Sequence, residues 1–300
     1  MDLRKILIFY RANSTSSKEA ALYCKDKLNR NNIVVEVIIN KDNNHINDYL
    51  LESNDFPDLV IVLGGDGTVL RAASALQNYK IPILSFNIGG NLGFLTHERS
   101  LLLESNFIQM IKDDNFIIEK RMMLKASINS KEISDNINHL PNRLYALNDF
   151  YFRTSNNNPS SICHLELEIE KEKVDQHIGD GIIVATPTGS TAYSMASGGP
   201  IVHPKVDSII VTPISPISLS SRSIIVPKES ELKVKIIARE NGEVCLWKDG
   251  KSAFNLKNND YCTINISDNT TNLMLLNNHI SYYETLSTKL NWAGNIINKD

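Results

Sequence analysis

The sequence has few cysteines and no long apolar run. Its four cysteines are Cys24, Cys163, Cys245 and Cys262. They form no Cys-x-x-Cys pair and no spacing typical of zinc ligands, which argues against a structural zinc site and predicts a reduced, cytoplasmic setting. No apolar run reaches the roughly 18 residues that a transmembrane helix needs, so we expect no membrane association.

An excess of positive charge is also absent. The 31 Lys and Arg residues are outnumbered by 34 Asp and Glu residues, for a net charge of -3. The sequence therefore shows no concentration of basic residues that could bind a nucleic-acid backbone, and we expect no nucleic-acid partner. A nucleotide substrate remains possible, because one phosphate site needs only local backbone donors and a metal ion.

The first third of the chain alternates strand and helix signals. Continuous apolar, β-branched runs predict four buried strands, at Lys5–Tyr10, Ile33–Ile39, Asp58–Leu63 and Ile81–Phe86. Helical spacing over Lys18–Asn29 follows candidate N-cap residues in Ser14–Ser17, and a short helix is expected to begin near Thr68. This βαβ rhythm predicts a parallel sheet with helices on its faces.

The later chain has a different pattern. Apolar and charged residues alternate with period two in Cys163–Glu170, Leu232–Ala238 and Tyr261–Ile266, as in strands that are wet on one face. No long helix is predicted between about Arg121 and His279. The predicted fold is therefore α/β plus all-β: an N-terminal Rossmann-like parallel sheet domain followed by a C-terminal antiparallel β-sandwich domain.

A glycine-rich turn follows the third predicted strand. Gly64-Gly65-Asp66-Gly67-Thr68 lies where a buried parallel strand enters a helix, and ligands bind at this edge of open α/β sheets. Glycines let the backbone approach a phosphate, and the helix offers unpaired N–H groups. Asp66 would repel phosphate unless it holds a metal, accepts a proton or hydrogen-bonds a hydroxyl. The turn matches neither a Walker A loop nor GxGxxG, and a purely structural turn remains an alternative.

A second stretch, Gly179–Ser194, combines a predicted strand with a turn dense in hydroxyls. The strand Gly181–Ala185 runs into Pro187-Thr188-Gly189, a turn that lets a planar ligand lie close to the backbone. Tyr193 is available for stacking or packing. A Ser/Thr-rich turn without a ligand is the alternative.

These blocks carry a resemblance to known kinases. Gly64–Thr68 resembles the signature shared by NAD kinases, by diacylglycerol and sphingosine-type lipid kinases and, more distantly, by phosphofructokinases. The stretch from Gly179 to Ser194, continuing through Ser197-Gly198-Gly199-Pro200, is similar to the most specific block of the NAD kinase family. Three further blocks agree with it: Asn87–Leu95, Ala146–Asp149 and Leu286–Trp292.

The resemblance implies transfer of the γ-phosphoryl group of ATP to the 2′-hydroxyl of the adenosine ribose of NAD. It implies Mg²⁺ or another divalent metal, whose ligands stay unassigned, and a homodimer or homotetramer. The expected domains are 1–122, an α/β phosphate-binding domain with the catalytic aspartate, and 123–280, an all-β NAD-binding domain. Residues 281–300 are expected to return to the N-terminal domain. A lipid or sugar kinase, or a non-catalytic NAD(P)-binding sensor, is the alternative.

The resemblance also implies roles for single residues. Asp66 is the expected catalytic group, acting on the ribose hydroxyl. The turn residues Gly64, Gly65, Gly67 and Thr68 are expected to bind the ATP phosphates. The expected NAD-binding residues are Asp66, Gly67, Arg71, Asn148, Asp149, Asp180, Thr191, Ala192, Tyr193, Ser194, Met195 and Ala196. Arg71 is a plausible phosphate partner, with a solvated helix-face charge as the alternative.

Some positions depart from the family pattern or need another interpretation. Ile217 stands where relatives commonly carry histidine, and Lys251 stands where they often carry glutamine. Both can alter subunit contacts or the outer pocket. His177 and His203 flank the second block and are interpreted as structural.

Overall fold

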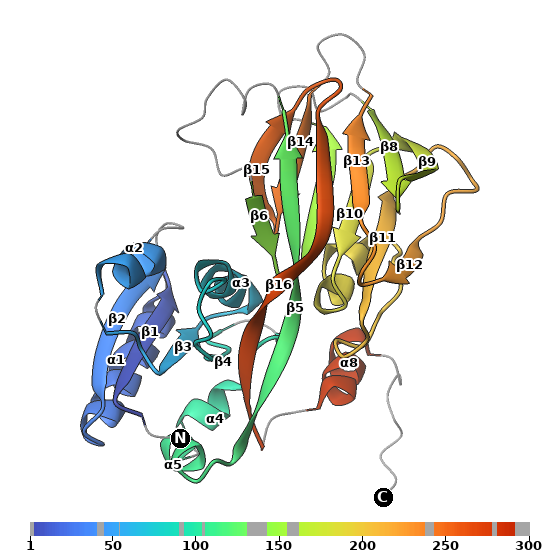
Figure 1. The fold of residues 1–300 in the computed structure, drawn as a ribbon. Helices are drawn as coiled ribbons and strands as arrows, with labels where there is room; N and C mark the ends of the chain where they lie inside the picture. Colours follow the sequence, from blue (N-terminus) through green and yellow to red (C-terminus); the bar gives the residue numbers. More distant parts are fainter. Residues whose placement is uncertain are drawn as a thin grey trace, which may run out of the picture. The chain divides into compact units, whose positions relative to one another are not determined.

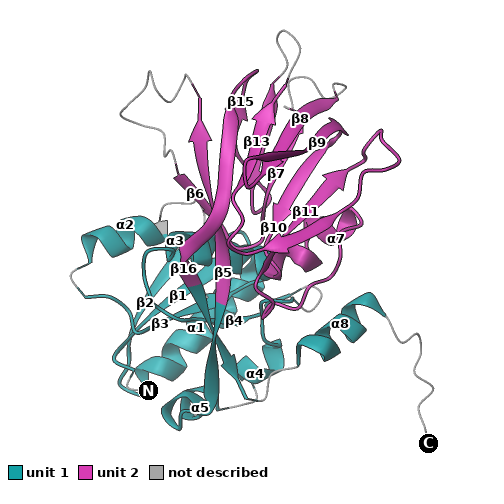
Figure 2. Ribbon diagram, turned by 45° about the vertical axis from the view of Figure 1, so that its right-hand side comes forward, with its two compact units in different colours: residues 1–120, 271–300 teal, residues 121–270 magenta. Residues whose placement is uncertain are grey.

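The computed structural model describes residues 3–40, 45–53, 55–89, 93–103, 106–130, 143–154, 162–237, 243–277 and 281–291. The chain divides into two compact units, shown in two colours in Figure 2. Unit 1 comprises residues 1–120 and 271–300, and unit 2 comprises residues 121–270. Two long strands, β5 (Phe116–Asn129) and β16 (Tyr261–Leu276), contribute residues to both units.

Unit 1 is built on a parallel sheet with helices on both faces (Figures 1 and 2). Its strand order is β2-β1-β3-β4, and β16 adds a parallel pair between Leu273 and Ile83. The strands are β1 (Lys5–Arg11), β2 (Val34–Asn40), β3 (Leu59–Leu63) and β4 (Ile83–Phe86). The helices are α1 (Thr15–Asn29), α2 (His45–Glu52), α3 (Asp66–Ala75), α4 (Arg99–Leu103), α5 (Phe107–Lys112) and α8 (Tyr282–Leu290). The predicted parallel-sheet fold of this region is confirmed.

Local sequence explains where the first helices begin. The Ser14 hydroxyl accepts a hydrogen bond from the Ser17 N–H at 3.2 Å and so caps α1, as the serine cluster predicts. α3 begins at Asp66 rather than near Thr68, because Gly65 adopts the extended N-cap conformation. That earlier start puts Asp66 in the first helical turn, where N–H groups lack intrahelical partners.

Unit 2 is an antiparallel sandwich of two sheets. In one sheet the order is β12-β11-β10-β7-β14-β15, and in the other β16, β13, β8 and β9 are consecutive neighbours while β5 pairs with β16 and with β6. Apart from β5 and β16, the strands are β6 (Arg143–Ala146), β7 (Asp149–Thr154), β8 (Cys163–Ile169), β9 (Glu172–Gly179), β10 (Gly181–Ala185), β11 (Ser208–Ile214), β12 (Ile224–Pro227), β13 (Leu232–Ile236), β14 (Val244–Lys248) and β15 (Lys251–Leu256). One apolar cluster, which includes Phe152, Leu165 and Ile264, joins both sheets. The predicted antiparallel β-sandwich is confirmed.

Helices in the described part of unit 2 are short, as the sequence predicts. A 3₁₀ helix, η1 (Thr188–Thr191), and a single α-helical turn, α7 (Tyr193–Ala196), follow β10 in the second block. The main departure is the length of β16, which has 16 residues against the six predicted at Tyr261–Ile266. Its second half, with Thr271, Asn272 and Leu273, lacks the clean alternation that marks its first half.

The sandwich core gives a first test of the packing. Phe152 has no exposed surface and belongs to the cluster that joins the two sheets of unit 2. We expect Phe152→Ala to lower the free energy of unfolding by about 3–5 kcal/mol in urea titrations, because it leaves a cavity. Ile225→Ala, at a position that is 52% exposed on β12, is the control and should cost less than about 1 kcal/mol. Equal losses for the two variants would contradict this description of the core.

Candidate active site

The glycine turn after β3 is closed by backbone contacts. The Gly64 N–H donates to the Phe86 carbonyl at 3.0 Å, and the Thr68 N–H donates to the Gly65 carbonyl at 2.8 Å. A Cβ atom on Gly64 would lie 2.4 Å from Thr68 Oγ1, so this position excludes any side chain. The turn therefore holds the start of α3 directly at the end of β3, where helix N–H groups favour an anion.

The Asp66 carboxylate is fixed by the backbone of another segment. It accepts hydrogen bonds from the Phe94 N–H at 2.8 Å and from the Leu95 N–H at 3.1 Å, one on each oxygen. An ionised carboxylate has about four acceptor positions, so each oxygen can accept a further bond. Asp66 is half-buried, while the adjacent Gly67 is exposed. The carboxylate is thus oriented and remains able to bind a hydroxyl or a metal.

Gly93, in the glycine-rich loop Asn87–Leu95, leaves room for the Asp66 carboxylate. A Cβ atom at this position would lie 2.0 Å from Asp66 Oδ1 and 2.3 Å from Thr96 Oγ1. Only glycine leaves room for the carboxylate to reach the Phe94 and Leu95 N–H groups. Within the loop, Gly90, Asn91 and Leu92 lie outside the described residues.

The C-terminal helix packs on the same segment of unit 1. The Phe94 ring lies 6.5 Å from the Tyr282 ring, centroid to centroid, and the Lys289 ammonium lies 4.3 Å from the Phe94 centroid. Lys289 belongs to the block Leu286–Trp292 that the sequence singles out, whose last residue, Trp292, lies outside the described residues. α8 therefore covers one side of the segment that holds Asp66.

In unit 2 the Asn148-Asp149 turn is held by a residue that sequence reasoning missed. The Asp249 carboxylate accepts the N–H groups of Leu147 at 3.1 Å, Asn148 at 2.8 Å and Asp149 at 3.2 Å. The Asp249 N–H donates in return to the Asp149 carbonyl at 3.0 Å. The Asp249-Gly250 pair predicts the turn between β14 and β15, but nothing local in the sequence indicates its long-range partners.

The hydroxyl-rich turn packs directly on this backbone. The Thr186 hydroxyl donates to the Leu147 carbonyl at 2.6 Å and accepts from the Gly189 N–H at 3.0 Å. A Cβ atom on Gly189 would lie 2.1 Å from the Asn148 carbonyl oxygen. Two blocks about forty residues apart, Ala146–Asp149 and Thr186–Ala196, are therefore brought together within unit 2.

Aromatic rings line the same region. The Tyr151 ring stacks on Trp247 with a centroid distance of 5.6 Å, and its edge meets Tyr193 at 4.9 Å. Thr191, Ala192, Tyr193 and Met195 keep part of their surface exposed, and Ala196 is exposed. Ser194 is buried instead, and its hydroxyl is hydrogen-bonded to the Thr212 hydroxyl at 2.9 Å. The Ser194 side chain is therefore engaged in packing the turn.

Burial governs the ionisation of this region. Desolvation, and then the nearby charge of Asp249, raise the pKa of Asp149 to about 8. Burial also raises the pKa of Asp249, against its three backbone donors. The pKa of Tyr151 rises to about 12, first through burial and then through the Asp149 charge. Near neutral pH the Asp149 carboxyl is therefore mostly protonated, and it can donate a hydrogen bond to a ligand.

One predicted binding residue, Asp180, lies apart from these clusters. Asp180 is exposed and precedes β10, whereas Thr186 follows the other end of that strand. At about 3.3 Å per strand residue the two positions are roughly 20 Å apart, so the structure does not bring Asp180 to the hydroxyl-rich turn of its own unit. Arg71 lies half-buried on α3, five residues or about 1.4 helical turns after Asp66.

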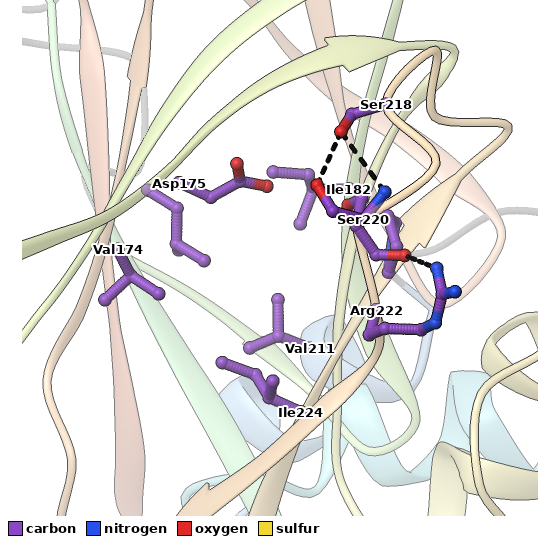
Figure 3. A pocket seen from close by; sticks show the side chains of 11 residues that line it. Val174, Asp175, Ile182, Val211, Ser218, Ser220, Arg222 and Ile224 are labelled. Atoms are coloured by element: carbon purple, nitrogen blue, oxygen red, sulfur yellow. Dashed lines mark hydrogen bonds between the residues drawn. The ribbon is translucent and has the colours of Figure 1, made fainter.

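A cavity in unit 2 involves none of the predicted site residues. It has a volume of about 300 Å³ and is shown in Figure 3. Its floor is apolar, with Ile182, Val211 and Ile224, and its rim carries Asp175 and the loop from Ser218 to Arg222. Ile217, one of the departures from the family pattern, precedes this loop and is 62% exposed.

Two global properties of the described residues bear on cofactors and membranes. They contain no group of three or more His, Cys, Asp or Glu side chains placed to hold a metal ion. Nor do they include a helix of the length and apolar character required to cross a membrane.

A carboxylate in a glycine turn at the edge of a parallel sheet, joined in one chain to a β unit with a hydroxyl-rich turn, is the arrangement that we expect of a phosphotransferase. Comparisons with known proteins specify the class further. The model of the ATP-NAD kinase N-terminal domain matches residues 6–112, and that of the C-terminal domain matches residues 147–276. The chain therefore belongs to the ATP-NAD kinase family.

Individual relatives agree with this assignment. NAD kinase 1 of Prochlorococcus marinus is 45% identical over 97% of both chains, and NAD kinase 1 of Parasynechococcus marenigrum is 39% identical over 99% of this chain and 98% of its own. The chain is thus an enzyme with NAD kinase activity, which transfers a phosphoryl group from ATP to NAD. The relatives give no support to the lipid-kinase, sugar-kinase or sensor alternatives.

Solved structures share the fold at lower identity. A yeast NADH kinase complexed with NADH has a TM-score of 0.82 at 23% identity, covering 99% of this chain and 90% of its own. An NAD kinase from Archaeoglobus fulgidus in complex with ATP has a TM-score of 0.72 at 22% identity, covering 96% and 98%.

The close approach at Gly93 leads to a prediction. Gly93→Ala places a methyl group where Asp66 Oδ1 now lies, so the carboxylate must leave the Phe94 and Leu95 N–H groups. We expect kcat to fall by roughly 10- to 100-fold, because a displacement of about 1 Å is enough for such a loss. Steady-state kinetics measures the effect, and circular dichroism verifies the fold. A folded variant with wild-type kcat would show that Asp66 need not be held there.

The raised pKa of Asp149 leads to a prediction about how the stability of the fold depends on pH. A carboxyl that binds its proton more tightly in the folded state than in the unfolded state destabilises the fold as pH rises from about 4 to about 8. Asp149→Asn removes that dependence. The free energy of unfolding of the wild type minus that of the variant should therefore decrease with rising pH, by up to about 1.4 kcal/mol per pH unit. Urea titrations across this range measure it, and a difference independent of pH would contradict the assignment.

Proposed function

We propose that Asp66 is the group that orients and deprotonates the 2′-hydroxyl of the adenosine ribose of NAD during phosphoryl transfer. The supporting observation is its anchoring by the Phe94 and Leu95 N–H groups, which leaves each oxygen able to accept another bond. A hydroxyl that donates to one oxygen is held for attack on the γ-phosphorus, and its proton passes to the carboxylate as the new P–O bond forms.

The turn around Asp66 is suited to the phosphates of ATP. Gly65 and Gly67 keep part of the backbone exposed, the buried Gly64 closes the turn against Phe86, and the first N–H groups of α3 favour negative charge. Thr68 is buried and fixes the turn from beneath. Arg71, on the same helix, is a further phosphate partner.

A divalent metal ion, Mg²⁺ or another, fits this site when ATP brings it. Mg²⁺ is usually bound through one or two carboxylates together with substrate phosphates, and the acceptor positions left on Asp66 supply one such ligand. The metal ion would neutralise charge on the phosphoryl oxygens. A site built from protein ligands alone is not suggested by the described residues.

Besides Asp66, Gly67 and Arg71 of unit 1, the proposed NAD-binding residues are those gathered in unit 2. Asn148 and the protonated Asp149 carboxyl offer donors and acceptors for the hydroxyls and amide of a dinucleotide. Thr191, Ala192, Tyr193 and Met195 add exposed surface beside the Tyr151–Trp247 stack. Ser194 contributes through its backbone position. Asp180 stays a predicted NAD contact.

Further properties follow from the family and the cysteines. The proposed division of labour is a phosphate-binding domain at 1–122, an NAD-binding domain at 123–280 and a C-terminal segment at 281–300. We infer a homodimer or homotetramer from the family resemblance. A cytoplasmic location is inferred from the four free, buried cysteines.

The activity is tested by incubating the protein with ATP, Mg²⁺ and NAD and measuring NADP with an NADP-specific dehydrogenase. Omitting the metal should abolish turnover. Parallel reactions with diacylglycerol and with fructose 6-phosphate should give no product, since the acceptor residues are polar and placed for a dinucleotide. Phosphorylation of either compound in place of NAD would contradict the proposal.

Asp66→Asn tests the catalytic role. The amide oxygen can accept one of the two N–H bonds, but the amide cannot take up the hydroxyl proton, so we expect a folded protein whose kcat is lower by roughly 100-fold or more. Glu19→Gln, an exposed charge on α1, is the matched control and should leave kcat unchanged. If Asp66→Asn keeps near wild-type turnover, Asp66 is not the base.

A further inference from the structure

The segment Phe94–His97, in which the Phe94 and Leu95 N–H groups bind Asp66, is fixed to β4 by several hydrogen bonds. Phe86 and His97 form a parallel bridge, in which the His97 N–H donates to the Ser85 carbonyl at 2.9 Å and the Asn87 N–H donates to the His97 carbonyl at 2.8 Å. The buried Ser85 hydroxyl donates to the Leu95 carbonyl. Leu95 is therefore held through its carbonyl, while its N–H binds Asp66.

The His97 side chain extends this network to β16. The ring is 4% exposed, and its Nδ1 lies 2.8 Å from the Ser85 carbonyl oxygen. The Leu276 N–H donates to Nε2 at 3.1 Å. A carbonyl needs a donor and an N–H needs an acceptor, so the neutral ring with its proton on Nδ1 satisfies both. The imidazole thus connects β4 with the last residue of β16.

His97 lies two residues after Leu95, and its ring packs against Phe86 with a centroid distance of 5.6 Å. Removing the ring would leave the buried Leu276 N–H without its acceptor and open space beneath the segment, so Phe94 and Leu95 could shift. Their N–H groups set the direction of the Asp66 carboxylate. The ring is therefore connected to the carboxylate through Ser85 and Leu95.

We propose that His97 is a positioning residue for phosphoryl transfer: it fixes the backbone that orients Asp66 and acts only through that carboxylate. The inference rests on the proposed role of Asp66. His97 itself accepts no proton from substrate, because both ring nitrogens are engaged by the protein.

Three substitutions separate the two ring contacts. His97→Ala removes both and should lower kcat by roughly 10- to 100-fold, with KM for NAD and ATP changed by less than about threefold, because orientation matters in the transition state. His97→Gln keeps an acceptor near the Nε2 position for Leu276, and His97→Asn keeps a donor near the Nδ1 position for Ser85. Each should recover part of the lost kcat.

A double-mutant cycle shows whether His97 acts through Asp66. In the Asp66→Asn background, His97→Ala should change kcat by less than about threefold, since the carboxylate it would orient is already gone. Leu28→Ala, in the core of unit 1 away from Asp66, controls for lost stability and should leave kcat unchanged below its melting temperature.

The possible failures are distinct. Wild-type kcat in His97→Ala, a change confined to KM, or losses that multiply in the double mutant would overturn the positioning role and leave the function of Asp66 intact. Near wild-type turnover in Asp66→Asn would overturn both proposals.

Discussion

The candidate active site depends on one interaction, in which a pair of backbone N–H groups binds the Asp66 carboxylate. In the proposed role a negative charge lies beside the ATP phosphates, and the two N–H donors offset part of that charge while they fix the direction of the carboxylate. Phe94 and Leu95 supply this restraint from a segment 28 residues away. Gly93 leaves the space for it, because any side chain there would occupy the position of Oδ1. The requirement for glycine is therefore set by the aspartate.

Unit 2 contains the same type of hydrogen bond between a carboxylate and backbone N–H groups, but with the roles of the two partners exchanged. There the Asp249 carboxylate collects the N–H groups of Leu147, Asn148 and Asp149, so a side chain fixes a backbone instead of being fixed by one. In both cases one buried or half-buried carboxylate satisfies N–H groups that have no ladder partner. Each arrangement joins segments far apart in the sequence: in unit 1 it fixes Asp66 itself, and in unit 2 it fixes the backbone that carries Asp149.

The sequence predicts the local features well and the long-range ones poorly. The turn at Gly64–Thr68 can be predicted because the glycines, the preceding apolar run and the following helix are contiguous in the sequence. The Ser14 cap can be predicted because it directly precedes its helix. Asp249 could be predicted only as a turn residue, since its three partners lie about 100 residues away. The contacts of His97 cross to residues 85 and 276 and have no local pattern at all. The sequence does not predict the full length of β16, because its second half packs in another part of the fold and lacks the apolar–polar alternation of its first half.

The buried aspartate pair lowers the stability of this fold. Asp149 and Asp249 are both removed from water, and each opposes ionisation of the other. The three backbone donors favour charge on Asp249, so the proton is held by Asp149, whose pKa is raised to about 8. Apolar residues of similar volume would avoid this cost. They would also leave three N–H groups unpaired and remove a carboxyl that, when protonated, can donate a hydrogen bond, which is the role that the proposed NAD site gives to Asp149.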